Sequence, residues 1–149
     1  MLHFTSYDIE TSNPLCIEDS NGVIAIASDD TTITGYFWTD IGIDTTYRDS
    51  LDAGTYTVLV SNTFGCHANR TIELFEPEWP IDSLVTTADL CSQGLGSVQL
   101  FLNGQASDFD INWPFDEGTD PLHIDGVDFG SYTVALIDSN GCVYEQNLY

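Results

Sequence analysis

The chain has 149 residues and a net charge of −22, because 24 Asp and Glu face only two Arg and no Lys. This charge excludes nucleic acid and anionic membrane surfaces as partners, since phosphate binding needs clustered Lys and Arg. The acids are interspersed and 42% of the residues are hydrophobic, so the chain is expected to fold rather than form a disordered acidic tail. No apolar stretch is long enough for a transmembrane helix, so no membrane insertion is expected.

The predicted secondary structure is β throughout. Short runs rich in Val, Ile, Thr, Tyr and Phe alternate with clusters of Gly, Asn, Asp and Ser, and no stretch keeps a helical period. In the first half, strands are predicted at 4–9, 22–27, 35–39, 55–61 and 69–75. In the second half, they are predicted at 83–87, 97–102, 108–113, 131–138 and 143–148.

The second half repeats the landmarks of the first. Each half opens with Leu-Cys, continues with a Gly and a Trp, and closes on Gly-x-Tyr-Thr-Val and then Gly-Cys. The landmark pairs are Cys16 and Cys91, Gly22 and Gly96, Trp38 and Trp113, Gly54 and Gly130, and Cys66 and Cys142. Such a duplication predicts two tandem modules, at 1–76 and 82–149. The Pro-rich segment 77–81 between them is expected to be a short, semi-rigid linker.

The strand spacing predicts that each module is a small antiparallel β-sandwich of the immunoglobulin-like kind. The order Cys, Trp, Cys matches that fold, and Trp38 and Trp113 are expected in the core against a disulfide. Tyr56 and Tyr132 lie ten residues before the second Cys of each module. A tyrosine corner has its Tyr two residues before that Cys, so a true immunoglobulin domain is not expected.

Four Cys allow three disulfide connectivities. The duplication favours Cys16–Cys66 and Cys91–Cys142, one in each module, because each unit must once have folded alone. Closing such a loop is worth about 4 kcal/mol in the chain-entropy model. A zinc site is less favoured, because there is no CxxC motif and His67 has no counterpart in the second repeat. Disulfides imply an extracellular or cell-surface location, and the absence of a signal peptide favours an excerpt of a longer exported protein.

The closing phrases of the two repeats, at 51–66 and 129–142, resemble the SprB-type repeat of Bacteroidota cell-surface adhesins. Units of that family end in the pattern L-x-x-G-x-Y-T-V-x-V-x-D-x-x-G-C, and here the first repeat has Asn62 at the Asp position. The resemblance covers about residues 14–75 and 89–149. It implies long exported filamentous proteins, some linked to gliding motility and delivered by type IX secretion.

Acidic loops are the candidate metal ligands. Calcium takes oxygen ligands from such clusters, and the residues proposed for it are Asp108, Asp110, Asp116, Glu117 and Asp120. The alternative is a solvated acidic surface, since no EF-hand pattern is present. No cofactor other than calcium is expected. An enzyme is not expected either, because nucleophile motifs are absent and a small module leaves little room for a cleft.

Two further sets of candidate residues lie on the predicted surface. Aromatic side chains outside the positions shared by the repeats are candidates for contact with a ligand such as a surface glycan: Tyr47, Trp79 and Phe115. Short Asp-Ser/Thr-x patterns resemble the O-glycosylation signal of Bacteroidota, with candidate acceptors Thr31, Thr45, Ser50 and Ser83.

The sequence supports three functional hypotheses. The first is a structural or adhesive tandem repeat that extends, spaces and displays, with neighbouring repeats or other copies of itself as partners. The second is a carbohydrate- or calcium-dependent binding module. The third is a filament subunit that assembles by strand exchange through the terminal strands at 4–9 and 143–148.

Overall fold

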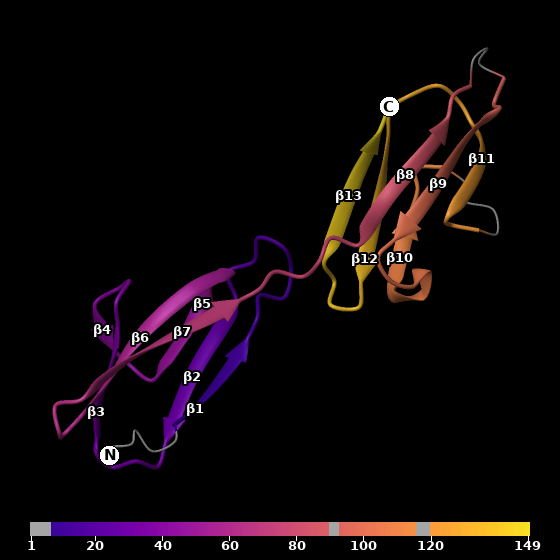
Figure 1. The fold of residues 1–149 in the computed structure, drawn as a ribbon. Coiled ribbons are helices and arrows are strands. Elements are labelled where there is room, and N and C mark those ends of the chain that lie inside the picture. Colours follow the sequence, from indigo (N-terminus) through magenta and orange to yellow (C-terminus); the bar gives the residue numbers. More distant parts are fainter. Residues whose placement is uncertain (1–6, 90–92, 116–119) are drawn as a thin grey trace. The chain divides into compact units, whose positions relative to one another are not determined.

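The structure is a computed structural model that describes residues 7–89, 93–115 and 120–149. It is all-β, with four antiparallel sheets, as the sequence predicts (Figure 1). The chain divides into two compact units, Met1–Pro77 and Glu78–Tyr149, and each contains two of the sheets. The bounds predicted for the linker stay a prediction. Within the described part of the chain, no helix is long and apolar enough to cross a membrane.

Unit 1 is a sandwich of a three-stranded and a four-stranded sheet. The first sheet has the order β1-β2-β5 and contains β1 (Tyr7–Ser12), β2 (Gly22–Ser28) and β5 (Tyr47–Leu51). The second has the order β4-β3-β6-β7 and contains β3 (Ile33–Trp38), β4 (Ile43–Asp44), β6 (Gly54–Asn62) and β7 (His67–Leu74). The chain changes sheet between β2 and β3, between β4 and β5, and between β5 and β6, which is the strand order of an immunoglobulin-like sandwich.

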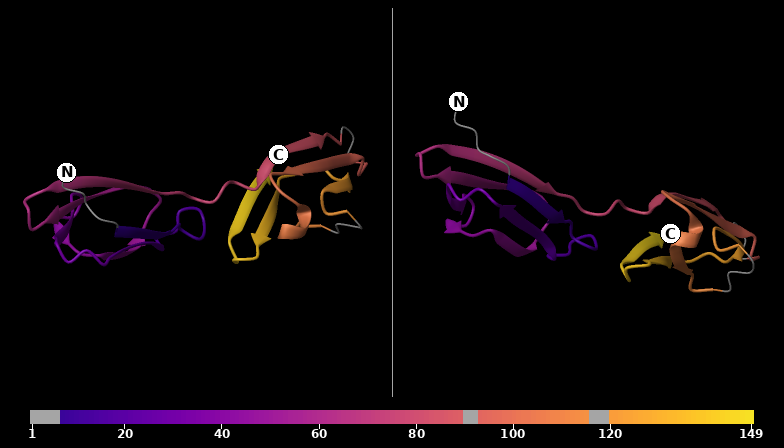
Figure 2. Two further views of the ribbon diagram at one scale, coloured as in Figure 1. Left: turned by 60° about the horizontal axis from the view of Figure 1, so that its bottom comes forward. Right: turned by 90° about the horizontal axis from the view of Figure 1, so that it is seen from below.

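The two sheets of unit 1 pack on each other through one apolar core, and Figure 2 shows them as separate layers. The alternation of side chains along β2 and β6 places every second residue on the inner face, where Ile24, Val58 and Val60 are fully buried. The other members of the core are Ile26, Trp38, Leu51, Ile72 and Leu74.

Unit 2 repeats this topology. One sheet has the order β11-β9-β8 and contains β8 (Ile81–Thr87), β9 (Gly96–Leu102) and β11 (His123–Val127). The other has the order β10-β12-β13 and contains β10 (Phe109–Asn112), β12 (Tyr132–Asp138) and β13 (Val143–Leu148). A 3-10 turn, η1 (Ala106–Asp108), precedes β10.

The sequence analysis missed β5 and its counterpart β11. Both strands are short and mostly polar, and each carries an extra residue opposite its partner strand, at Ser50 and at Gly126. Both extra residues have positive φ, 53° and 76°. The irregular pairing is a β-bulge, which breaks the period-2 pattern by which strands are predicted.

Both modules contain a tyrosine corner, against the expectation from sequence. Tyr56 lies near the start of β6, and its hydroxyl donates to the carbonyl of Asp52, 2.7 Å away. Tyr132 does the same in β12 with the carbonyl of Asp128, at 3.0 Å. The expectation was wrong because it measured the corner from the Cys, and the Cys of these modules lies beyond the strand, in the turn that follows it.

The expectation of one internal disulfide per module was also wrong. Cys16 and Cys142 are disulfide-bonded, whereas Cys66 is a free thiol. Cys16 is therefore not bonded to Cys66, and unit 1 has no internal disulfide. Cys91 itself lies outside the described residues.

Candidate functional site

The two cysteines of unit 1 lie at opposite ends of the sandwich. The loop that contains Cys16 is attached to the far end of β7, because the Asn13 Oδ1 atom accepts from the Phe75 amide and the Glu76 carboxylate accepts from the Glu18 amide. Cys66 lies just before the start of β7. The eight residues of β7 separate these ends by roughly 23 Å at about 3.3 Å per residue. A disulfide needs Cα atoms within about 7 Å, which excludes a bond between them.

The turn that carries the second cysteine is the same in both modules. In unit 1, the Asn62 Oδ1 atom accepts from the amides of Phe64 and Cys66, at 3.1 and 3.0 Å. In unit 2, the Asp138 Oδ1 atom accepts from the amides of Asn140 and Cys142, both at 2.9 Å. Each turn ends on a glycine with positive φ before the Cys. The closing phrase of the repeat therefore encodes a strand and a capped turn that hold this cysteine at the module end.

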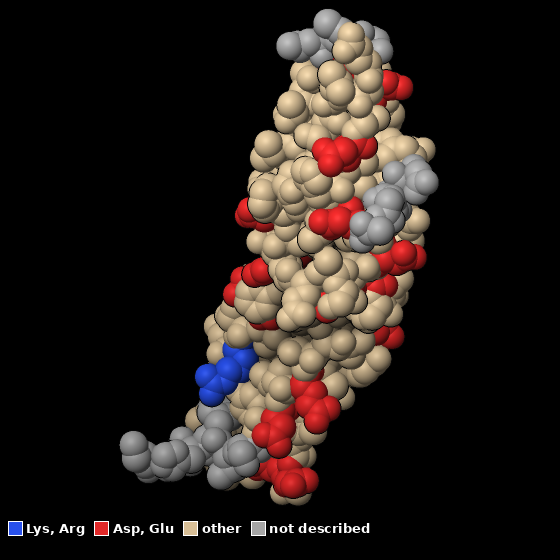
Figure 3. Space-filling view, turned by 90° about the vertical axis from the view of Figure 1, so that its right-hand side faces the viewer, with Lys and Arg blue, Asp and Glu red and all other residues tan. Residues whose placement is uncertain are grey.

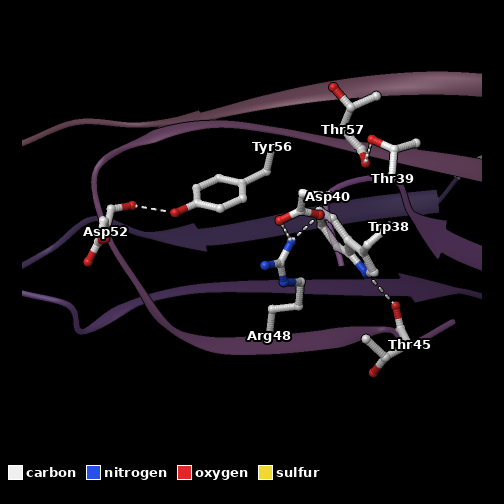
Figure 4. A network of polar contacts seen from close by, with 8 residues as sticks. All are labelled: Trp38, Thr39, Asp40, Thr45, Arg48, Asp52, Tyr56 and Thr57. Carbon is white, nitrogen blue, oxygen red and sulfur yellow. Dashed lines mark hydrogen bonds and ion pairs between the residues drawn. The ribbon is translucent and has the colours of Figure 1, made fainter. Parts of the chain in front are cut away.

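A cation fills the space between the Trp and the Tyr in unit 1. The Arg48 guanidinium carbon lies 4.8 Å from the ring centroid of Trp38 and 5.0 Å from that of Tyr56 (Figure 4). Its Nη1 atom is 2.9 Å from the Asp40 carboxylate. The Arg48 side chain is only 9% exposed, against 40% for Asp40. Trp38 is fully buried, as predicted for the core, and packs against this cation rather than a disulfide.

In unit 2, apolar side chains fill the corresponding space between the Trp and the Tyr. Phe115 follows Trp113 by two residues, as Asp40 follows Trp38, and its ring stacks on Trp113 with centroids 5.6 Å apart. The same ring meets Tyr132 edge-on at 5.2 Å. Ile124 takes the place of Arg48, because Ile124 pairs with Val98 as Arg48 pairs with Ile24. An ion pair in one module is thus replaced by two apolar side chains in the other.

Two tyrosines have raised pKa values. Burial raises the pKa of Tyr56 above its ordinary 10.0, and the negative charge of Asp52 raises it further, partly offset by Arg48. Burial, followed by the charge and hydrogen bond of Asp138, raises the pKa of Tyr144. Both hydroxyls therefore stay protonated as donors at neutral pH, which is the state that the tyrosine corner and the capped turn require.

Three of the five residues proposed for calcium, Asp108, Asp110 and Asp120, lie in the described part of the chain. Asp116 and Glu117 lie outside the described residues, and Asp110 is exposed. Asp108 and Asp120 each accept a hydrogen bond from a nearby backbone amide, of Gln105 and Leu122. Over residues 7–89, 93–115 and 120–149, no three His, Cys, Asp or Glu form a group that would hold a metal. The calcium site stays a prediction.

The aromatic residues proposed for ligand contact have different surroundings. Tyr47 is 54% exposed on β5, and Trp79 is 41% exposed with its ring edge-on to Tyr144 at 5.6 Å. Phe115 packs in the module between Trp113 and Tyr132, which leaves its ring engaged inside the fold. Contact of these residues with a glycan stays a prediction.

The four candidate glycosylation acceptors differ in access. Thr31, Ser50 and Ser83 are exposed. Thr45 is half-buried, and its hydroxyl donates to the carbonyl of Tyr47 at 3.1 Å. The exposed three fit a modification site better than Thr45 does.

The acidic residues are spread over the surface. Figure 3 shows them scattered over the viewed face instead of forming one patch. Arg48 and Arg70 are both engaged with aromatic rings, of Trp38 and Tyr56 for the first and of Tyr7 for the second. The viewed surface therefore offers dispersed negative charge and no basic patch.

Comparison with known proteins gives no family. No family model matches the chain, and no curated protein matches it. The crystal structure of murine CEACAM1b is similar over 95% of this chain and 97% of that chain, at 14% sequence identity and a TM-score of 0.41. A likeness at that TM-score adds nothing to the fold that the strand order establishes.

Proposed function

We propose that the chain is a structural and adhesive segment of an exported bacterial surface protein or extracellular filament. Its β-sandwich repeats extend and display, and disulfides link each repeat to the next. The observation that carries this proposal is the position of the cysteines at opposite ends of one module. The chain has no catalytic role in this proposal.

Cysteines at opposite ends suit connection between modules. Cys16 is disulfide-bonded and Cys66 of the same module is a free thiol, and in this proposal the bond of Cys16 leads to another module. A covalent link at each end of a repeat carries tension past the linker and limits how far the chain extends under load. Under this proposal, Cys66 is a position that links to a further repeat or to another copy of the protein.

The setting follows from the same chemistry. Disulfides persist in oxidising, extracytoplasmic compartments, which favours a cell-surface or secreted protein. The absence of Lys leaves only Arg48 and Arg70 for trypsin-like proteases, which suits exposure outside the cell. The SprB-type closing phrase supports a Bacteroidota surface adhesin and export by the type IX route.

Disulfide mapping by mass spectrometry tests the proposal. The two arginines divide the chain into fragments 1–48, 49–70 and 71–149, and the cysteines fall as Cys16, Cys66, and Cys91 with Cys142. After thiols are blocked and the unfolded chain is digested with trypsin without reduction, we expect fragment 1–48 to be linked to 71–149. Fragment 49–70 should carry a blocked thiol. A link between 1–48 and 49–70 would contradict the proposal.

Two serine variants form a matched pair for this test. Cys66→Ser should leave thermal stability unchanged, because Cys66 forms no bond in the isolated chain. Cys16→Ser should lower the stability of the oxidised protein and make it equal to that of the reduced protein. Equal losses for both variants would instead indicate a disulfide within the module.

Strand exchange is the alternative route to a filament. In this structure β13 pairs along its whole length with β12, so exchange would require it to leave its own module. Sedimentation with and without reductant distinguishes the two routes. Multimers linked by disulfides return to monomers on reduction, whereas strand-exchanged multimers persist.

A further inference from the structure

Unit 2 has an open cavity at the end where β13 finishes. Its volume is about 120 Å³, and the lining includes Thr87, Asp89, Val127, Tyr132 and Leu148. Tyr149 and Phe129 also line it and are 90% and 84% exposed. The cavity therefore lies between the end of β8, the tyrosine corner and the last residues of β13.

Unit 1 fills the same place with its own chain. The register aligns the two modules here, because Tyr56 pairs with Ile72 as Tyr132 pairs with Leu148. Two residues beyond Ile72, Leu74 pairs with Gly54 and is 2% exposed. The equivalent position in unit 2 is two residues beyond Leu148, opposite Gly130.

The contacts of Leu74 in unit 1 indicate which kind of side chain fits the cavity of unit 2. Its Cδ1 atom lies 2.8 Å from the point where a Cβ on Gly22 would be, and the counterpart of Gly22 is Gly96, beside Ser97 in the cavity wall of unit 2. The pocket in unit 2 is thus the space in which unit 1 holds a leucine. Asn13 accepts a hydrogen bond from the Phe75 amide in unit 1, but its counterpart in unit 2 is Ala88, which has no side-chain acceptor. An occupant of the unit 2 cavity would therefore be held by its apolar side chain and by backbone hydrogen bonds to the neighbouring strand.

We propose that this cavity is a docking site for an apolar side chain carried on an extended strand that continues β13. The occupant is a leucine-like residue directly after Tyr149, as in the Ile72-Glu73-Leu74 sequence of unit 1. Alternation along a strand supports it: Leu148 points inward and is 5% exposed, Tyr149 points outward, and the next side chain points inward. The inference goes beyond the adhesive role, because it concerns how the module is completed.

An extended chain tests the site. The tetrapeptide Leu74-Phe75-Glu76-Pro77 is copied after Tyr149, and the matched control carries Ser in place of the leucine in that copy. Burial of a leucine should slow hydrogen exchange of the amides in β13 and at 128–130 about tenfold or more relative to the serine control. The amides of unit 1 should not change in either chain, which provides an internal reference.

Two results would overturn the proposal. Equal exchange rates for the leucine and serine extensions would show that the cavity does not take the side chain. Protection of the same amides in the unextended chain that rises with protein concentration would show that a second copy occupies the site. Neither of these exchange measurements depends on a cysteine. They therefore test the cavity separately from the proposed disulfide links between repeats, which the tryptic map tests.

Discussion

Ser50 has a backbone conformation that suits glycine. Its φ of 53° lies in the left-handed region, and the second module has Gly126 at the equivalent position of the same β-bulge. A side chain in this region costs about 1–2 kcal/mol, of which the greater freedom of glycine in the unfolded chain cancels a part. We therefore expect Ser50→Gly to raise the free energy of unfolding of unit 1 by about 1 kcal/mol, measured by urea denaturation.

Two substitutions serve as controls for Ser50. Gly126→Ser should destabilise unit 2 by a similar amount, because it places a Cβ at φ 76°. Ser83→Gly, in β8 at a residue without positive φ, should destabilise its module instead of stabilising it. A loss of stability on Ser50→Gly would show that the serine hydroxyl, which bonds Asp49, outweighs the backbone strain.

Two large core residues were predictable from sequence. Trp38 and Trp113 are buried as predicted, at 0% and 8% exposure. Their neighbours were not predictable, because Arg48 lies ten residues after Trp38 on a strand of the opposite sheet. Sequence spacing alone does not show which side chain crosses from one sheet to the other.

At the scale of elements, the two modules solve one packing problem in two ways. Asp40 and Arg48 in unit 1 correspond to Phe115 and Ile124 in unit 2, and each pair fills the space beside the Trp and the Tyr. Replacing an ion pair by well-packed apolar residues is often neutral or stabilising, whereas removing one partner is costly. The double variant D40F/R48I should therefore keep the stability of unit 1 within about 1 kcal/mol.

The single variants complete this cycle. Asp40→Phe leaves the Arg48 side chain, 9% exposed, without its carboxylate and should cost about 3 kcal/mol. Arg48→Ile should cost less, about 1 kcal/mol, because Asp40 is 40% exposed and partly solvated. Urea unfolding of the wild type, the two single variants and the double variant gives the coupling energy between residues 40 and 48. Additive effects of the two substitutions would contradict the idea that the apolar pair replaces the ion pair. The double variant keeps the net charge, so long-range electrostatics do not confound it.

The turn before the second cysteine shows how far the sequence motif could be understood. The repeat pattern carries an Asp at this position, and the first module has Asn62 instead. Both side chains present an oxygen to two backbone amides, so the change preserves the turn. The sequence identified the motif, and the structure supplies the reason for each residue in it.

At the scale of the whole molecule, the net charge of −22 sets how stability depends on salt. The acids repel one another over a screening length of about 30 Å at 0.01 M salt, which falls to about 3 Å at 1 M. We expect the melting temperature to rise by several degrees when NaCl is raised over this range. A melting temperature that does not change would show that the dispersed acids are already screened from one another by solvent.

Calcium provides the control for this salt effect. Calcium, magnesium and sodium chlorides are compared at matched ionic strength, so that screening is equal. A larger rise with calcium than with magnesium would support the site proposed around Asp108 and Asp120. Equal rises would contradict it and leave a solvated acidic surface.

The sequence by itself determined the all-β class, the duplication, and the buried Trp positions, because these follow from local periodicity and from comparing one half with the other. Only the tertiary structure decided which cysteines are able to bond. A single strand such as β7 carries the chain from one end of the module to the other, so Cys16 and Cys66 are separated although they bracket one repeat. The tyrosine corner, the Arg48 packing and the cavity beside Leu148 were decided in the same way, because each joins residues that only the folding of one sheet onto the other brings together.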